Sequence, residues 1–296
     1  MDTLKSILWL RQCDSQQKLI KELVSFHIYF DLNEIPKKIP KARSLLKWKI
    51  NCRELPPFDK LLKRDLYRLS KGLEYPVNVG RNIAIDAALT HFVLASDIEL
   101  YPSPGLAQGF LQMLENNHTL LKSETRIVYP LKIFEVQQTS AMPSTKYELQ
   151  NLLAKGSAQS FHLTICPSCH SGPRLSEWIN SKNASNNIKV FHVTKWKPYY
   201  KYWEPICIGT KNDPHYYERL TWEGMWDKWT QIYTLCLLDY EFHTLDNAFL
   251  VHKPGIKKDT VHEERLQKSF RTYKLLMRDI ILELVEKYSW HRNCAV

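Results

Sequence analysis

The sequence contains no long hydrophobic run. Nowhere in its 296 residues do about 18 apolar residues follow one another, the length that a membrane-spanning helix needs. The first ten residues are too polar, and their apolar part too short, for a secretory signal peptide. Taken alone, these absences favour a cytosolic chain. The sequons Asn117-His118-Thr119 and Asn183-Ala184-Ser185 favour a lumenal one, because N-glycosylation occurs only there.

Nucleic-acid-binding motifs are also missing. The formal net charge is +10 with 41 Lys and Arg residues, which permits anionic partners such as nucleic acid, membranes, acidic glycans or nucleotide phosphates. The basic residues are interspersed with acids, and the densest group lies between Lys37 and Arg43. Since no motif accompanies this charge, we expect no nucleic-acid partner.

An even set of cysteines is lacking as well. Seven cysteines leave at least one unpaired or bridged to another chain, so their number does not identify the compartment. Cys236 lies in an apolar helical pattern, which predicts a buried thiol. Cys166-x-x-Cys169-His170 has no distant second ligand pair, which argues against a structural zinc site.

What is present is the composition of a folded α/β protein. With 44% hydrophobic residues the chain can form one large domain, or one domain with a helical appendix. Apolar periodicity predicts alternating helices and strands. The helices are expected at 4–10, 19–24, 58–70, 82–90, 106–115, 146–153, 226–238 and 260–288, and the strands at 25–30, 92–95, 126–136, 188–194, 199–209 and within 240–254.

Two carboxylates follow the apolar run at 92–95. Such a run is typical of the middle of a covered parallel sheet, and Asp97 and Glu99 come directly after it. Alternation points both side chains the same way, at the strand end where open α/β sheets bind ligands. Two acids so placed suit a divalent cation that bridges nucleotide phosphates and neutralises a departing diphosphate. Solvated loop acids are the alternative.

The helix predicted from Asn82 precedes this strand. Its amino end would offer free backbone N–H groups and the positive end of the helix dipole, with Arg81 beside them. This combination suits a phosphate or the carboxylate of a uronic acid. A surface arginine is the alternative.

Five segments carry a resemblance to a known family. They are NVGRNIA, THFVLASDIELYPSPGL, YWEPICIGT, DPHYYERLTWEGMWDK and NAFLVHKPGIK. Together, and in this order, they resemble glycosyltransferase family 49 from about Ile7 to about Lys257. The resemblance implies a GT-A-like, Rossmann-related fold, with a mixed central sheet flanked by helices. We expect a glycosyltransferase domain at 1–257, and a long carboxy-terminal helix packed on it as an extension at 258–296. The family has a similar C-x-x-C-H segment, so the resemblance further implies that Cys166 and Cys169 are a structural cysteine pair, disulfide or thiol.

The resemblance also implies an activity. It is metal-dependent, inverting transfer of glucuronic acid or N-acetylglucosamine from a UDP-sugar to a glycan on a glycoprotein, as in O-mannosyl glycan synthesis. Asp97 and Glu99 would hold Mn²⁺ or Mg²⁺ together with His252, which stands where GT-A enzymes bring a carboxy-terminal histidine to the metal. Arg81, Asn82 and Asp97 would bind the donor.

An inverting transfer needs a carboxylate that accepts the proton of the acceptor hydroxyl. The polar loop at 213–228 leads into a predicted helix, and GT-A enzymes commonly supply the base from such a loop. Asp227, near the amino end of that helix, is therefore the first candidate and Glu223 the second. Favourable interaction with the helix dipole is the alternative explanation for Asp227.

The family further implies a membrane-anchored Golgi protein. Its members carry a nucleotide-binding first strand, preceded by a lumenal stem and a membrane anchor, whereas the resemblance here starts at the helix after that strand. We therefore expect an amino-terminally truncated type II membrane protein, attached to the membrane only through the missing anchor and possibly homodimeric. A catalytically inactive glycan- or nucleotide-binding relative is the alternative.

Overall fold

The chain divides into two compact units, Met1–Tyr75 and Pro76–Val296. The computed structural model describes residues 2–62, 66–122, 124–167, 169–170, 172–182, 185–221, 226–253, 255–257 and 263–294. The expected domain boundary between residues 257 and 258 is a different one and stays a prediction.

The first unit consists of short helices joined by irregular segments. Residues 25–30 do not form the predicted strand, because alternation alone does not supply the partner strand that backbone hydrogen bonds require. The single helix predicted at 58–70 is also wrong, since the backbone is extended at Leu61. The helical elements are α1 (Asp2–Gln12), α2 (Gln17–Leu23), η1 (Leu32–Glu34), α3 (Ala42–Leu45), η2 (Pro57–Lys60) and α4 (Tyr67–Ser70).

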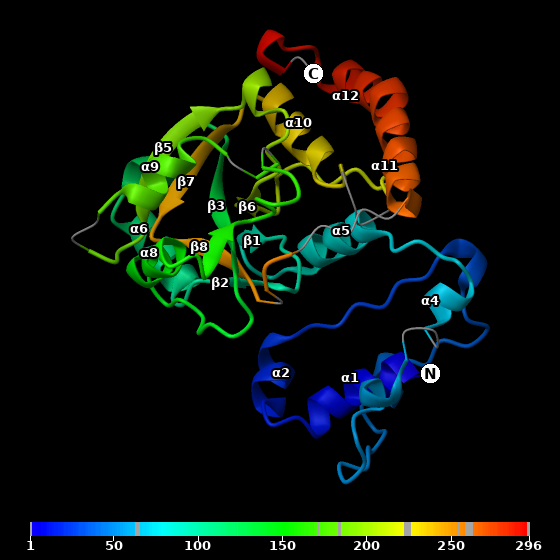
Figure 1. Cartoon of the computed structure of the whole chain (residues 1–296). Coiled ribbons are helices and arrows are strands. Elements are labelled where there is room, and N and C mark those ends of the chain that lie inside the picture. Colours follow the sequence, from blue (N-terminus) through cyan, green and yellow to red (C-terminus); the bar gives the residue numbers. More distant parts are fainter. Residues whose placement is uncertain are drawn as a thin grey trace. The chain divides into compact units, whose positions relative to one another are not determined.

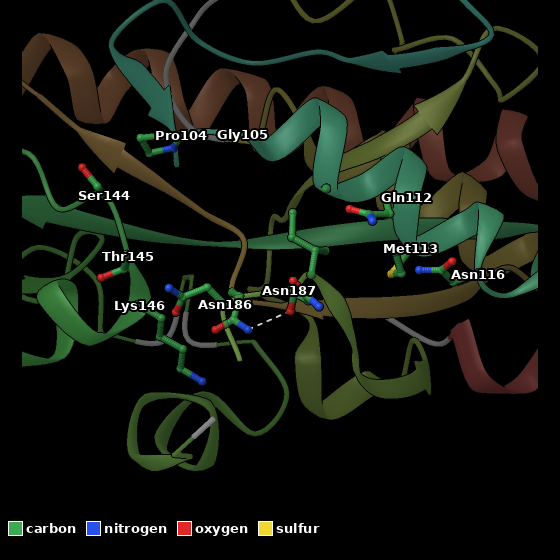
Figure 2. Close-up of a pocket in the computed structure, with 13 residues that line it drawn as sticks. Pro104, Gly105, Gln112, Met113, Asn116, Ser144, Thr145, Lys146, Asn186 and Asn187 are labelled. Atoms are coloured by element: carbon green, nitrogen blue, oxygen red, sulfur yellow. Dashed lines mark hydrogen bonds between the residues drawn. The ribbon is translucent and has the colours of Figure 1, made fainter. Parts of the chain in front are cut away.

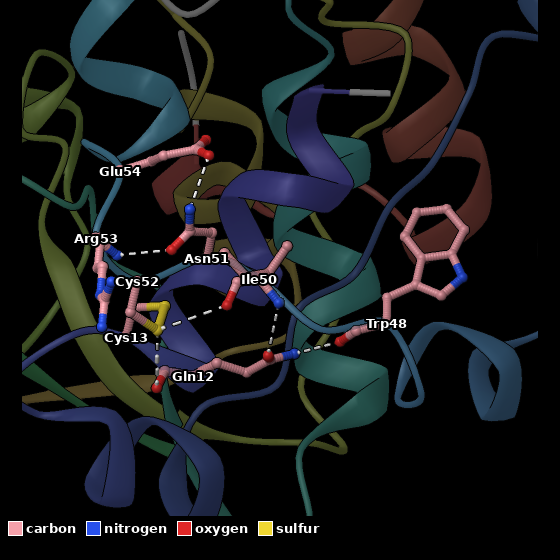
Figure 3. The surroundings of a disulfide bond; sticks show 8 residues. All are labelled: Gln12, Cys13, Trp48, Ile50, Asn51, Cys52, Arg53 and Glu54. Carbon is pink, nitrogen blue, oxygen red and sulfur yellow. Dashed lines mark hydrogen bonds between the residues drawn. A yellow bond between two sulfur atoms is a disulfide. The ribbon is translucent and has the colours of Figure 1, made fainter.

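A disulfide between Cys13 and Cys52 links distant parts of this unit, 39 residues apart in the sequence (Figure 3). The neighbouring Gln12 side chain donates to the Trp48 carbonyl at 2.8 Å and accepts from the Ile50 N–H at 3.1 Å. Within the described part of the unit, only one apolar side chain is fully buried. Covalent and polar cross-links, more than a hydrophobic core, therefore hold this unit together.

The second unit is built on a mixed sheet with eight strands among the described residues (Figure 1). Its main path is β1-β6-β3-β7-β5, with β8 and β4 also paired to β3, and β2 paired to β8. β7 and β8 run parallel to β3, and the other pairings are antiparallel. The strands are β1 (Phe92–Leu94), β2 (Leu100–Pro102), β3 (Ile127–Val136), β4 (Ala158–Ser160), β5 (Lys189–Lys195), β6 (Ile206–Thr210), β7 (Glu241–Asp246) and β8 (Phe249–His252).

Helices flank this sheet, which confirms the predicted fold class. The helix predicted at 106–115 forms with those bounds. The aromatic-rich stretch at 199–209 is only partly a strand, because its first residues form a 3₁₀ turn. The helical elements before residue 263 are α5 (Val77–Ala87), α6 (Leu106–Glu115), α7 (His118–Lys122), α8 (Lys146–Ala154), α9 (Leu175–Asn180), η4 (Pro198–Tyr200) and α10 (Trp229–Leu237).

β3 is the central strand. Its amino-terminal half pairs with β6 and β7, and its carboxyl-terminal half with β8 and β4. Tyr129, Leu131 and Ile133 pack in one core with α6, whereas Phe134 and Val136 pack in another with α8 and α9. Alternation along β3 thus places apolar side chains in cores on both faces of the sheet.

β1 lies at an edge of the sheet and not in its middle. Among the strands of the described residues it pairs only with β6, in antiparallel register from Phe92↔Thr210 to Leu94↔Ile208, and its side chains are half-buried. The expectation of a central parallel strand is therefore wrong. A short apolar run predicts burial but does not fix the position of a strand within the sheet.

The carboxy-terminal end is helical, as predicted. α11 (Glu263–Leu275), the π-helical turn η5 (Leu276–Ile280) and α12 (Ile281–Tyr288) follow one another, shown in orange to red in Figure 1. Leu276, Ile280 and Leu284 are buried in one core with residues of α10. The amphipathic pattern of this segment thus corresponds to a face that packs within the second unit.

A disulfide between Cys236 of α10 and Cys294 of the 3₁₀ turn η6 (Arg292–Cys294) fastens this end. The prediction that Cys236 is a free thiol is therefore wrong. An apolar neighbourhood indicates burial, and it is equally compatible with a buried disulfide. The unpaired cysteine is Cys207.

We expect Cys294→Ser to lower the free energy of unfolding by about 2–4 kcal/mol, because the unfolded chain gains the freedom of an opened loop. The loop spans 58 residues. Denaturant unfolding of the oxidised protein measures the effect. Cys207→Ala is the matched control, since it removes a cysteine and leaves every disulfide intact. Equal stability of Cys294→Ser and the wild type would contradict the role of this bond.

Candidate active site

α5 begins at Val77, five residues earlier than predicted. Arg81 and Asn82 consequently lie inside the helix, and the expected anion site at free N–H groups of Asn82 does not form. Pro76 is the N-cap residue, and its carbonyl accepts the hydrogen bond of the Gly80 N–H at 3.1 Å. The backbone N–H groups of Arg81 and Asn82 are therefore not free to bind an anion, and the contacts of these two residues come from their side chains.

Two asparagines of α5 hold the loop that precedes α10. Asn78 Nδ2 donates to the carbonyls of Tyr217 and Asp227, each at 2.9 Å. Asn82 exchanges two hydrogen bonds with the backbone of Tyr216, at 2.8 and 2.9 Å, and is itself only 3% exposed. Asn82 therefore positions this loop, and its predicted role in donor binding stays a prediction.

Arg81 joins two carboxylates that are distant in sequence. Its NH1 donates to Asp227 Oδ2 at 2.7 Å, and its NH2 to Asp97 Oδ1 at 2.9 Å. Lys228 Nζ lies 3.4 Å from Asp97 Oδ2 and 3.5 Å from Asp227 Oδ2. α5, the loop after β1 and the start of α10 therefore meet in one cluster of alternating charges. Here and below, the charge cluster means Arg81, Asp97, Asp227 and Lys228.

Burial and pairing shift the pKa values of this cluster in opposite directions. Burial alone would raise the pKa of Asp97, but the cations Lys228 and Arg81 outweigh it, and the net shift is downward. Burial likewise opposes the charged forms of Lys228 and Arg81, yet Asp227 and Asp97 raise both pKa values. The contribution of Asp97 to stability is thus present above the pKa of an unfolded aspartate and is lost as pH falls through its lowered pKa.

Glu99 and His252 meet beside this cluster, because β2 and β8 pair with Leu100 opposite His252. His252 Nδ1 lies 2.7 Å from the carbonyl oxygen of Gly255. A carbonyl only accepts, so Nδ1 carries a proton. The other ring nitrogen, Nε2, lies 3.4 Å from Glu99 Oε1, is buried and makes no hydrogen bond to a described residue.

An imidazole nitrogen and a carboxylate oxygen at this separation can both bind a cation that lies between or beside them. Lys257 Nζ also forms an ion pair with Glu99 Oε1, at 3.3 Å. Asp97, the third predicted ligand, is turned toward Arg81 and Lys228. Over the described ranges of the chain, no three His, Cys, Asp or Glu side chains are grouped closely enough to hold a metal. Glu99 and His252 thus fit a metal as they stand, whereas Asp97 would have to exchange partners.

The sequence reasoning missed one carboxylate of this region. Glu204 lies two residues before β6, and the charges of Asp227, Lys228, Arg81 and Asp97 act on it. Burial first, and then the charge of Asp227, raise its pKa to about 7. The signal available in the sequence was an acid between Trp203 and Pro205 at the start of a strand.

His170 of the Cys166-x-x-Cys169-His170 segment also lies near the charge cluster. Burial, followed by the charge of Lys228, lowers its pKa to about 4. Cys166 and Cys169 form a disulfide, which confirms the structural cysteine pair. Glu223, the second candidate base, lies outside the described residues.

A separate cavity of about 280 Å³ opens between α6, the start of α8 and the segment before β5 (Figure 2). Amide and hydroxyl side chains dominate its lining. None of the predicted site residues that the structure describes lines it. The lining residues are Pro104, Gly105, Gly109, Gln112, Met113, Asn116, Ser144, Thr145, Lys146, Asn186, Asn187, Ile188 and Asn247.

The sequence is similar to those of known proteins. The model of a family described as "glycosyl-transferase for dystroglycan" matches residues 1–289, so the chain belongs to this family, glycosyltransferase family 49, as the resemblance indicated. Two β-1,4-glucuronyltransferases 1 are similar to it: that of Mus musculus, 30% identical over 243 residues, and that of Homo sapiens, 29% identical over 242. Each alignment covers 80% of this chain and 55% of the relative.

A more distant relative is the xylosyl- and glucuronyltransferase LARGE2s of Gallus gallus. It is 27% identical over 222 residues, which are 74% of this chain and 28% of the relative. The chain thus spans about half the length of the β-1,4-glucuronyltransferases that it matches.

We expect Arg81→Met to destabilise the protein by about 3–5 kcal/mol, because the buried Asp227 would lose its closest cation. Arg219→Met is the control. Arg219 pairs with Glu283 at the surface, where both side chains are more than 40% exposed, so its loss should cost less than about 1 kcal/mol. Denaturant unfolding at pH 7 compares the two. Equal losses would show that Arg81 does not hold the site together.

Proposed function

We propose that this chain is an inverting glycosyltransferase that moves glucuronic acid from UDP-glucuronic acid to an acceptor glycan of a glycoprotein, with the help of a divalent cation. N-acetylglucosamine is the second candidate sugar. Membership of the family and the glucuronyltransferase names of the relatives support sugar transfer. The observation that carries the metal is the buried Nε2 of His252, which makes no hydrogen bond to a described residue and lies 3.4 Å from Glu99 Oε1.

Glu99, His252 and Asp97 would hold Mn²⁺ or Mg²⁺. The bound cation would neutralise the charge that develops on the departing diphosphate. Arg81 and Lys228 lie beside Asp97 and add positive charge where the phosphates would be bound. For Asp97, ligation means giving up its contacts with Arg81 and Lys228, and both cations would then be free to contact the donor.

The second candidate function is a catalytically inactive relative that binds nucleotide or glycan. The ion pairs of Asp97 favour it, because Arg81 and Lys228 compete with a metal for the same oxygens. UDP binding with Mn²⁺ but no turnover would identify such a relative. Homodimerisation stays a prediction.

We place the chain in an oxidising, lumenal compartment such as the Golgi. Three disulfides among the described residues, Cys13–Cys52, Cys166–Cys169 and Cys236–Cys294, support this, because structural disulfides are rare in the cytosol. No helix in the described part of the chain is long and apolar enough to cross a bilayer. Mass spectrometry of native material, for intact disulfides and a glycan on Asn117, tests this placement.

We expect Glu99→Gln, His252→Gln and Asp97→Asn each to weaken Mn²⁺-dependent UDP binding at least about tenfold, because each removes a ligand or its charge. Calorimetry with UDP, in the presence of Mn²⁺ and of a chelator, measures this. Glu115→Gln is the control, since Glu115 is an exposed acid at the end of α6. The metal assignment would be overturned by variants that bind UDP with Mn²⁺ as tightly as the wild type.

A further inference from the structure

The cavity beside α6 has a lining that can form hydrogen bonds with a ligand (Figure 2). Gln112 and Asn116 of α6 lie on one side of it, and Ser144 and Thr145, before α8, lie on the other. The side chains of Gln112, Asn116 and Asn186 make no hydrogen bond to any described residue. Each amide group offers two N–H donors and one carbonyl acceptor. The cavity therefore presents both donors and acceptors that a ligand can use.

Two adjacent residues at the end of β7 fix the walls of this cavity. Asn247 Nδ2 donates to the carbonyls of Ser185 and Asn187, at 3.0 and 2.8 Å, and so holds the segment before β5. Asp246 Oδ1 accepts from Lys146 Nζ at 2.7 Å and from the Asn247 N–H at 3.0 Å, which ties the start of α8 to the same turn. The cavity is thus largely formed before a ligand arrives, as is usual for binding sites.

Size and charge restrict the ligand. The volume of about 280 Å³ is close to the lower limit of small-molecule pockets, about 300 Å³, which suits a single sugar ring. Among the described lining residues only Lys146 is charged, and its side chain is 3% exposed and paired with Asp246. Among these residues no free cation remains to bind a phosphate or a uronic acid carboxylate. A neutral sugar, whose hydroxyl groups both donate and accept hydrogen bonds, fits this lining.

The cavity and the proposed metal site lie at opposite ends of β2. Glu99 immediately precedes this strand, whereas Pro104 and Gly105, which line the cavity, follow it. At about 3.3 Å per residue, extended chain of this length separates the two places by roughly 10 Å or more. A glycan that reaches from the proposed metal site into the cavity must therefore contain more than one sugar residue.

We propose that this cavity is a glycan-binding subsite that holds a neutral sugar of the acceptor glycan, away from the sugar that receives the transfer. The proposal rests on the proposed function, because it takes the acceptor glycan as the ligand. No covalent bond forms or breaks in the cavity. Its role is to add contacts with long acceptors, so it should lower their KM and leave kcat unchanged.

The test fills the cavity or removes one of its amides. Gln112→Trp places a large ring in the cavity, and Asn186→Leu replaces an amide by an apolar group of similar size. Gln108→Trp is the matched control, because Gln108 is also an exposed glutamine of α6 and does not line the cavity. All proteins are first freed of N-glycans, so that a glycan on the neighbouring Asn117 cannot occupy the cavity. Melting temperatures check that the variants are folded.

Binding is measured without donor or metal, so that it does not depend on transfer. Saturation-transfer NMR uses the methyl glycosides of galactose, mannose, xylose and N-acetylglucosamine, with methyl glucuronide as the charged comparison. We expect at least one neutral glycoside to bind the wild type and Gln108→Trp equally, and Gln112→Trp and Asn186→Leu at least about fivefold more weakly. Methyl glucuronide should give no signal that Gln112→Trp removes.

Kinetics then separate the subsite from the site of transfer. The acceptors are an O-mannosylated glycopeptide and p-nitrophenyl glycosides of single sugars, which are too short to reach the cavity. With UDP-glucuronic acid as donor, we expect Gln112→Trp to raise the KM for the glycopeptide about tenfold. Its kcat, and its KM for the short acceptors, should stay within about twofold of wild type. Gln108→Trp should match the wild type on both acceptors.

The subsite would be overturned, with sugar transfer intact, if no neutral glycoside bound the wild type or if both cavity variants bound as the wild type does. An unchanged KM for the glycopeptide in Gln112→Trp, or an equal rise for the short acceptors, would overturn its role in acceptor binding. Neutral-glycoside binding by a chain that transfers no sugar would overturn the proposed activity, and the cavity would then be the glycan site of an inactive relative.

Discussion

The guanidinium of Arg81 between Asp97 and Asp227 is the contact on which the candidate site depends. It joins three segments: α5, the loop after the edge strand β1, and the residues just before α10. The ion pair between Arg81 and Asp227 is almost fully buried, so removing the arginine would leave the charge of Asp227 buried without its closest counter-ion. The same contact that assembles these segments also occupies the carboxylate expected to bind the metal.

This double use constrains how the site can work. If Asp97 were part of an exposed ion pair, a divalent cation could displace its partner at little cost. Asp97 is instead paired with two cations, and one of them is nearly buried. Asp97 is nevertheless about one-third exposed, unlike Asp227. Between the two carboxylates, Asp97 is the one that can exchange a protein cation for a metal, while Asp227 keeps Arg81 in place.

The sequence predicted what depends on local pattern. The apolar strand pattern predicted β3, and helical periodicity predicted α6 with its observed bounds. The strand spacing of Glu99 and the family position of His252 anticipated two side chains that the structure brings to 3.4 Å. The position of β1 at the sheet edge and the disulfide partner of Cys236 were not predictable, because each depends on a segment more than 50 residues away.

Glu204 was missed for the same physical reason. Nothing in the tripeptide Trp203-Glu204-Pro205 indicates an acid with a raised pKa, since the shift comes from burial and from the charge of Asp227, which is distant in sequence. Asp227, in contrast, lies just before a helix as expected. Its ion pairs with Arg81 and Lys228 could not be read from the local pattern. The raised pKa of Glu204 thus comes from its surroundings and not from its residue type.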